Sequence, residues 1–135
     1  MYKRQVLGKL NKYDVYRSLD RFTEATYNPS ILIFRYDDDL YFANSDFFYE
    51  KIEEEITERK QIETLIIDFS SVSYIDSTGF DTLKLIADNL TSQNIRWKFA
   101  GMKGPIRDLF DKYGYQGIIS KSDCYMSIDM AVESC

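Results

Sequence analysis

Four consecutive residues, Asp76, Ser77, Thr78 and Gly79, hold the side chains most able to carry chemistry in this chain. They stand between a strand-like apolar run and apolar residues at helical spacing, so they mark the start of a helix. Asp76 or Ser77 can therefore act as the N-cap, accepting a hydrogen bond from a backbone N–H of the first turn. A phosphate on Ser77 would be favoured by the same N–H groups but repelled by Asp76 and, about one turn on, by Asp81. We place a candidate phosphorylation switch at Ser77.

Enzyme chemistry finds little support in the rest of the sequence. The chain contains no histidine, which removes the usual general base and the commonest zinc ligand. Residues 37–39 and Asp68 resemble the acids of a phospho-accepting receiver domain. That fold needs two helices and a strand between these positions, whereas the pattern here predicts one strand and one helix, so the spacing excludes it. Gly79 stands three residues after Asp76, whereas an aspartic protease places its glycine two residues after the acid. We therefore expect no enzyme activity, no catalytic residue and no metal site.

Length, charge and cysteine content narrow the class of protein further. At 135 residues the chain is long enough for one domain with a substantial core. Its formal net charge of −5 argues against binding to nucleic acid or to anionic membranes, which need clustered positive charge. Two cysteines without a CxxC pair, and no signal peptide, favour a reduced, cytosolic setting. No apolar run approaches the roughly 18 residues of a membrane helix, so we expect no direct membrane insertion.

Strand-like and helical patterns alternate along the chain. In order, we expect a short strand near Val6 and Leu7, an irregular connection over 11–30, strands 31–36 and 40–43 joined as a hairpin, a helix from Asn44 or Ser45 to about Lys60, strand 65–69, a helix after residue 76, strand 95–100, a helix from Pro105 to Gly114, a short strand at Ile118 and Ile119, and a helix over about 122–132. Such alternation implies parallel strands with right-handed crossovers. The fold class is therefore α/β, a mixed, largely parallel sheet of four to five strands covered by about four to five helices.

The periodicity also predicts which side chains face the core. The inward-facing positions of the helices are Phe48, Ile52, Ile56, Phe80, Leu83, Ala87, Leu90, Ile106, Leu109, Phe110 and Tyr113. In strand 95–100, the apolar residues Ile95, Trp97 and Phe99 alternate with Arg96 and Lys98. Tyr13, Tyr16 and Phe22 are expected to anchor the connection over 11–30 onto the core.

Several stretches resemble the STAS domain, which is shared by sulfate transporters and anti-sigma factor antagonists. The segment LIIDFSSVSYIDSTGFDTL resembles its central strand and signature turn. Three others resemble the branch attached to sulfate-permease type anion transporters: Leu7-Gly8 with Asp14-Val15-Tyr16-Arg17, ILIFRYDDDLYFAN at 31–44, and GMKGPIRDLF at 101–110. The departures are Ser30, where glycine is common, and Asp39, where proline or a small residue is common. Both concern turn geometry.

The resemblance implies a non-catalytic regulatory and interaction role. Residues 1–135 would form a single STAS domain, the C-terminal cytoplasmic part of a longer anion transporter, with Lys3 and Arg4 just inside the inner or plasma membrane. The implied partners are the membrane domain of the same transporter and a cytosolic protein that the sequence does not identify. No particular oligomeric state is implied. The alternative is a free-standing anti-sigma factor antagonist that acts as a serine phosphoswitch.

By the same resemblance, Ser77 occupies the position that a partner kinase phosphorylates in the antagonist branch. The motif and interaction surface around it would consist of Asp76, Thr78, Gly79, Asp81 and Lys103. No cofactor is implied. Some members of the family bind nucleotides, but nothing in this sequence requires one.

Overall fold

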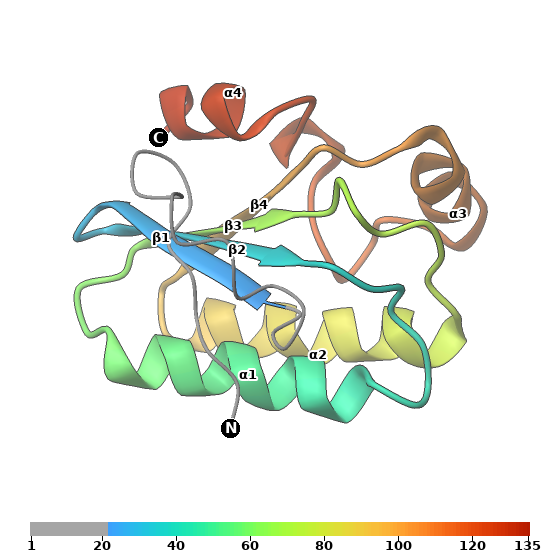
Figure 1. Ribbon diagram of the computed structural model, residues 1–135, viewed down its shortest axis with the longest axis horizontal. Coiled ribbons are helices and arrows are strands. Elements are labelled where there is room, and N and C mark those ends of the chain that lie inside the picture. Colours follow the sequence, from blue (N-terminus) through green and yellow to red (C-terminus); the bar gives the residue numbers. More distant parts are fainter. Residues whose placement is uncertain (1–21) are drawn as a thin grey trace.

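The computed structural model describes residues 22–135, which form a mixed sheet with helices on both faces (Figure 1). The elements are β1 (Phe22–Asn28), β2 (Ile31–Tyr36), α1 (Ser45–Glu58), β3 (Thr64–Asp68), α2 (Ser77–Ser92), β4 (Arg96–Ala100), α3 (Gly104–Tyr113), the short 3₁₀ helix η2 (Lys121–Asp123), β5 (Cys124–Tyr125) and α4 (Ile128–Glu133). The predicted strand near Val6 and Leu7, the anchors Tyr13 and Tyr16, and the basic pair Lys3 and Arg4 lie outside the described residues.

The sheet has the strand order β1-β2-β3-β4-β5, so neighbours in space are also neighbours in sequence. β1 is antiparallel to β2, and the other neighbouring pairs are parallel. In the pairing of β3 with β4, Leu65 lies opposite Trp97 and Ile67 lies opposite Phe99. The structure thereby confirms the predicted mixed, largely parallel sheet.

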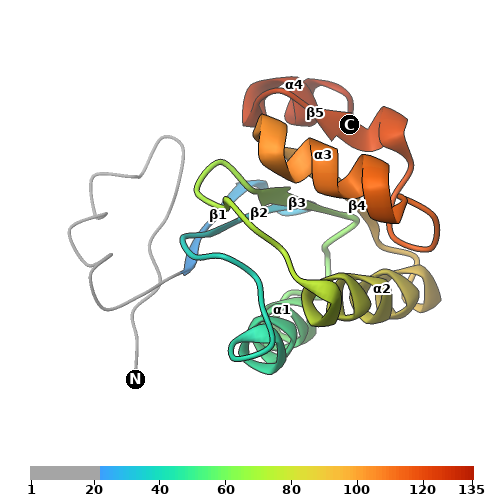
Figure 2. The same cartoon turned by 90° about the vertical axis from the view of Figure 1, so that its right-hand side faces the viewer.

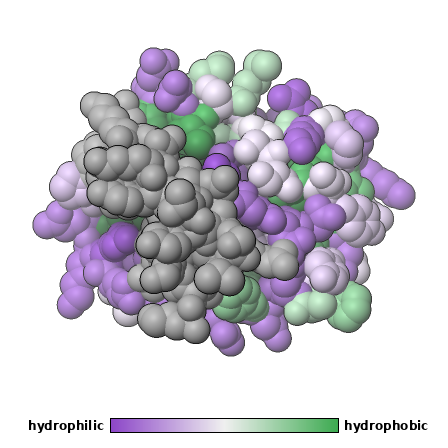
Figure 3. Space-filling view, viewed as in Figure 1, coloured by the Kyte–Doolittle hydropathy of each residue, from purple (hydrophilic) through white to green (hydrophobic). Residues whose placement is uncertain are grey.

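Helices α1 and α2 lie side by side on one face of the sheet and cover the larger apolar core (Figures 1 and 2). Their predicted inward-facing residues are all buried: Phe48, Ile52, Ile56, Phe80, Leu83, Ala87 and Leu90. Helix α4 covers the opposite face, where Ala131 packs in a smaller cluster with Ile33 and Ile66. The described surface visible in Figure 3 is mostly hydrophilic, with scattered hydrophobic residues.

Helix α3 packs against the start of α2. The ring of Phe110 lies 4.9 Å from that of Phe80 on α2 and 5.9 Å from that of Phe99 on β4, measured between centroids. Ile106 is also buried, whereas Leu109 is half-buried. These contacts place α3 and the N-terminus of α2 together, at the edge where the parallel strands have their carboxyl ends (Figure 1).

The antiparallel hairpin is formed by β1 and β2, and the predicted hairpin of 31–36 with 40–43 is wrong. Residues 22–28, expected within an irregular connection, form β1. Instead of a strand, Leu40 contributes one isolated parallel bridge, with Ile75. The acidic residues 37–39 carry the chain onward and do not reverse it, because the Asp39 carboxylate binds backbone N–H groups of the loop that follows β3.

The C-terminal part also differs from the prediction. Ile118 and Ile119 lie outside any strand, and the fifth strand is Cys124–Tyr125. The carbonyl oxygen of Ile118 accepts a hydrogen bond from the Trp97 indole at 2.8 Å, which ties this segment to β4 through a side chain and not through a ladder. The last helix begins only at Ile128, so the predicted helix over about 122–132 is wrong in its first half.

Two polar side chains have surroundings that the periodicity did not predict. Tyr113 was expected to face inward, but it is 56% exposed and its ring leans on the outside of Phe80 at 5.4 Å. Lys98 alternates with Trp97 and Phe99 as expected, yet it is only 2% exposed. Its ammonium donates a hydrogen bond to the Ser134 hydroxyl at 2.5 Å, because the C-terminal segment closes over that face of the sheet.

We expect Ile67→Asp to prevent folding. Ile67 is fully buried in β3, in register with Phe34 of β2 and Phe99 of β4. An aspartate there would leave an unpaired charge in the core, at a cost of more than about 4 kcal/mol. Circular dichroism and thermal melting measure the effect, with Leu85→Asp on the exposed side of α2 as the control that should still melt cooperatively. A soluble, cooperatively melting Ile67→Asp variant would contradict the buried position of β3.

Candidate functional site

Asp76 begins α2 and caps it with its carboxylate. Its Oδ1 accepts a hydrogen bond from the Gly79 N–H at 2.8 Å, which satisfies one of the unpaired donors of the first helical turn. Of the two candidate caps, Asp76 therefore takes the role, and Ser77 is the first residue of the helix. The side chains of Ser77 and Thr78 are exposed. The cap and the candidate switch are thus separate residues.

The second oxygen of Asp76 binds a different loop. Its Oδ2 accepts a hydrogen bond from the Phe42 N–H at 2.9 Å, across 34 positions of sequence. The backbone adds two more links, since the Asp76 N–H donates to the Leu40 carbonyl at 3.1 Å and the Leu40 N–H donates to the Tyr74 carbonyl at 3.0 Å. A single carboxylate therefore caps the helix and joins the loop after β2 to the loop after β3.

Asp39 makes a second cross-link between the same two loops. Its Oδ1 accepts hydrogen bonds from the N–H groups of Ser73, at 2.7 Å, and Tyr74, at 3.0 Å. The carbonyl of Asp39 accepts a hydrogen bond from the Asn44 side chain at 2.7 Å. Asn44 stands at the N-cap of α1, but its side-chain oxygen accepts from the Tyr41 N–H and not from the first turn of that helix. The sequence did not predict this role of Asp39. The one signal it offered was that an aspartate stands where the STAS domain commonly has proline or a small residue.

Gly79 is required by close packing and not by backbone conformation. A Cβ at this position would lie 2.7 Å from the Leu40 carbonyl oxygen and 2.8 Å from Cγ2 of Ile75. Both distances are far shorter than a carbon atom tolerates, and one of the two neighbours is backbone. The helix can therefore reach the two loops only because residue 79 has no side chain.

Two exposed aromatic residues belong to the loops that Asp76 and Asp39 hold together. Phe42 is 74% exposed and Tyr74 is 51% exposed, and each belongs to one of the two cross-linked loops. Asp81 is exposed on the first turns of α2. Lys103, predicted to share this surface, is exposed at the N-cap of α3, whereas α3 contacts α2 through Phe110 and Tyr113 nearer its other end. The surface beside Ser77 therefore combines exposed aromatic rings with negative charge.

The thiol of Cys124 is held in its neutral form. Burial, and next the charge of Asp123, raise the pKa of Cys124 to about 11. At neutral pH almost none of this group is thiolate, which is the nucleophilic form. Within residues 22–135, no group of three or more potential ligands is arranged to hold a metal ion. Nor does that part of the chain contain a helix long and apolar enough to cross a bilayer.

Comparison with known proteins agrees with this geometry. Residues 23–131 match the STAS domain family. The chain belongs to this family. Sulfate transporter 1.3 of Arabidopsis thaliana is 28% identical over 139 residues, which cover 96% of the STAS chain and 21% of the transporter. The chain therefore spans about a fifth of the length of this curated relative.

Solved structures show the same fold in two settings. The murine anion transporter Slc26a9, in its inward-facing state, matches the STAS domain with a TM-score of 0.72 and 25% identity, over 82% of this chain and 18% of that one. The anti-sigma factor antagonist SpoIIAA, in its unphosphorylated form, matches with a TM-score of 0.67 and 17% identity, over 84% of this chain and 94% of that one. SpoIIAA from Bacillus has also been solved in a phosphorylated form. At such low identity, the likeness to SpoIIAA concerns the fold alone.

We expect Gly79→Ala to destabilise the STAS domain by about 1–3 kcal/mol, because the new methyl group would collide with the Leu40 carbonyl. Urea unfolding followed by circular dichroism gives the change. Gly104→Ala is a matched control, since a Cβ at that helix start meets nothing within 4 Å. The control should be neutral or slightly stabilising. If Gly79→Ala and Gly104→Ala are equally stable, the close approach of Gly79 to the Leu40 carbonyl is incorrect.

Proposed function

We propose that this STAS domain is the C-terminal, cytoplasmic regulatory and interaction domain of a sulfate-permease type anion transporter. One observation carries the proposal: sulfate transporter 1.3 is similar to the chain over 96% of the chain's length, although the chain covers only 21% of that transporter. The TM-score of 0.72 with Slc26a9 supports the same assignment. The domain would lie at the cytoplasmic face of the inner or plasma membrane and bind the membrane domain of its own transporter, a cytosolic protein, or both.

The surface beside Ser77 is the docking site that the geometry favours. Exposed aromatic residues such as Phe42 and Tyr74 contribute strongly to protein contacts, since they bury large areas at little entropic cost. The cross-links from Asp76 and Asp39 fix the two loops that carry them, so little ordering is needed on binding. Asp76 stands next to Ser77 in the sequence, but both of its oxygens accept backbone hydrogen bonds that hold the two loops, so its carboxylate has a structural role. The site suits binding and not catalysis.

A phosphate at Ser77 would change this surface more than it changes the fold. Ser77 is the first residue of α2 and its side chain is exposed, so the helix dipole and unpaired N–H groups favour a phosphate there. The adjacent Asp76 and the exposed Asp81 oppose it through like charge. The two effects are of similar size and largely cancel within the domain. A docked partner would instead meet up to two new negative charges at its contact.

We predict that Ser77→Asp leaves the melting temperature within about 2 °C of wild type but weakens the main protein contact of the domain. Ser77→Ala should change neither stability nor binding by much, because Asp76 and not Ser77 is the cap. Thermal melts of the purified variants, and anion uptake by the intact transporter that carries them, test both statements. Ser92→Asp adds the same charge at the other end of α2 and serves as the control. If Ser77→Asp binds and transports like wild type, the motif is only a structural cap and the proposed switch at Ser77 is wrong.

The second candidate function is a free-standing anti-sigma factor antagonist that acts as a serine phosphoswitch, with Ser77 as the switch. It is considered because the chain's length is close to that of SpoIIAA, of which it covers 94%, although at 17% identity this match shows the fold alone. The two candidates differ in what surrounds the domain in the native protein. Detection of the native protein with an antibody against this domain, in separated membrane and soluble fractions of the source cells, distinguishes them. A membrane-bound band several times larger than the chain's 15.9 kDa supports the transporter, and a soluble band near that mass supports the antagonist.

A further inference from the structure

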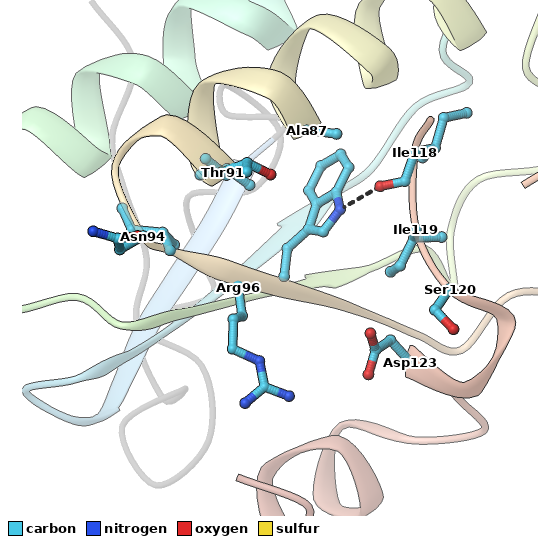
Figure 4. A pocket seen from close by; sticks show the side chains of 11 residues that line it. Ala87, Thr91, Asn94, Arg96, Ile118, Ile119, Ser120 and Asp123 are labelled. Carbon is cyan, nitrogen blue, oxygen red and sulfur yellow. Dashed lines mark hydrogen bonds between the residues drawn. The ribbon is translucent and has the colours of Figure 1, made fainter. Parts of the chain in front are cut away.

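The side chain of Lys98 lies under helix α4, on the face of the sheet opposite α1 and α2. In Figure 4, the Trp97 indole, marked by its hydrogen bond to the Ile118 carbonyl, lies on one side of β4, and the Arg96 guanidinium lies on the other. Side chains alternate along a strand, so Lys98 faces the same side as Arg96. Its register partner on β3 is Ile66, which belongs to the smaller apolar cluster covered by α4. Lys98 therefore places a charged side chain beside that cluster.

The positive charge of Lys98 has only neutral partners. The residue is 2% exposed, and its ammonium donates a hydrogen bond to the Ser134 hydroxyl at 2.5 Å. The centroid of the Tyr125 ring lies 5.5 Å from the same nitrogen. Among the residues whose side chains the structure describes, no carboxylate forms an ion pair with this ammonium. A buried charge is costly unless an opposite charge compensates it, so this site lacks one negative charge.

Ser134 is the residue that can supply the negative charge. It is exposed at the end of α4, and its hydroxyl donates to the Ala131 carbonyl at 2.7 Å while it accepts from Lys98. A phosphate on this oxygen would bring up to two negative charges next to the ammonium. The dipole of α4 and the exposed Glu133 oppose such a charge, but both act through solvent. The attraction to Lys98 is the stronger effect, because the desolvation of the lysine has already taken place on folding.

Few buried contacts hold α4 in place, so a modifying enzyme can reach Ser134. Of the six residues of α4 only Ala131 is buried, whereas α2 buries seven of its 16 residues. A short element with so few buried contacts opens locally at a low cost in free energy. Its opening would uncover the apolar face of the sheet that includes Ile33 and Ile66. A charge that fastens α4 would therefore control access to this face.

We propose that Ser134 is a phosphorylation site, and that its phosphate pairs with Lys98 and fastens α4 onto the sheet. A protein kinase would transfer the γ-phosphoryl group of a nucleoside triphosphate to the Ser134 oxygen. A bond forms between that oxygen and phosphorus, and the bond from phosphorus to the β,γ-bridging oxygen breaks. The nucleoside diphosphate leaves, and the hydroxyl proton passes to a base of the kinase. The proposal depends neither on the transporter assignment nor on Ser77.

The charge pairing is tested with a double-mutant cycle on the 135-residue chain. Ser134→Asp should raise the melting temperature by about 3 °C or more and slow amide hydrogen exchange in α4 by about tenfold, because the carboxylate can pair with the Lys98 ammonium. In a Lys98→Met background the same substitution should give neither effect. Ser92→Asp is the matched control, since the Ser92 hydroxyl donates to a carbonyl three residues earlier at the end of α2, as Ser134 does at the end of α4. It should not stabilise the chain.

The native protein tests the modification itself. Mass spectrometry of the protein isolated from its source cells, in several phases of growth, should find phosphate on Ser134. Treatment of that protein with a phosphatase should lower its melting temperature by about 3 °C or more. Three results would overturn the proposal: no stabilisation by Ser134→Asp, equal stabilisation in the Lys98→Met background, or no phosphate on Ser134 in any phase of growth.

Discussion

The carboxylate of Asp76 is the group on which the carboxyl edge of this sheet depends. One oxygen satisfies the Gly79 N–H at the start of α2, and the other satisfies the Phe42 N–H of a loop 34 positions earlier. Between these loops the backbone makes only the single Leu40–Ile75 bridge. Removing the carboxylate would leave two backbone donors without their acceptor, at about 1–3 kcal/mol for each one that water cannot reach. An uncharged side chain of the same size would make weaker bonds at both ends.

This arrangement divides the four residues of the motif into two kinds. Asp76 and Gly79 have structural roles. The Asp76 carboxylate accepts backbone hydrogen bonds, and Gly79 lacks the Cβ that would collide with the Leu40 carbonyl. Ser77 and Thr78 point outward, and their exposed hydroxyls stand on a backbone that the other two residues hold in place. A structural cap and an interaction surface are therefore compatible within the same short sequence.

The sequence predicted the elements whose pattern is set by burial along their own length, and missed those that depend on distant partners. β3, α2 and β4 follow from runs such as Leu65–Ile67, which the core surrounds on both faces. By contrast, β5 has two residues and takes its register from β4, and the loop at 37–39 takes its path from N–H groups after β3. At the site, cap chemistry limited the choice to Asp76 or Ser77, but only the coordinates could show that Asp76 reaches Phe42.

Helix α2 carries Ser77 as its first residue, and the packing of the helix determines how far a charge there can act. Its inner face, from Phe80 to Leu90, is buried on the sheet, so the helix cannot bend or slide without opening the core. Charge at Ser77 is screened over about 8 Å at physiological ionic strength, well short of the roughly 20 Å from Ser77 to the far end of α2. A phosphate on Ser77 would therefore act at the carboxyl edge of the sheet, on the partner that docks there, and an effect at the far end of α2 would require a partner that contacts both ends of the helix.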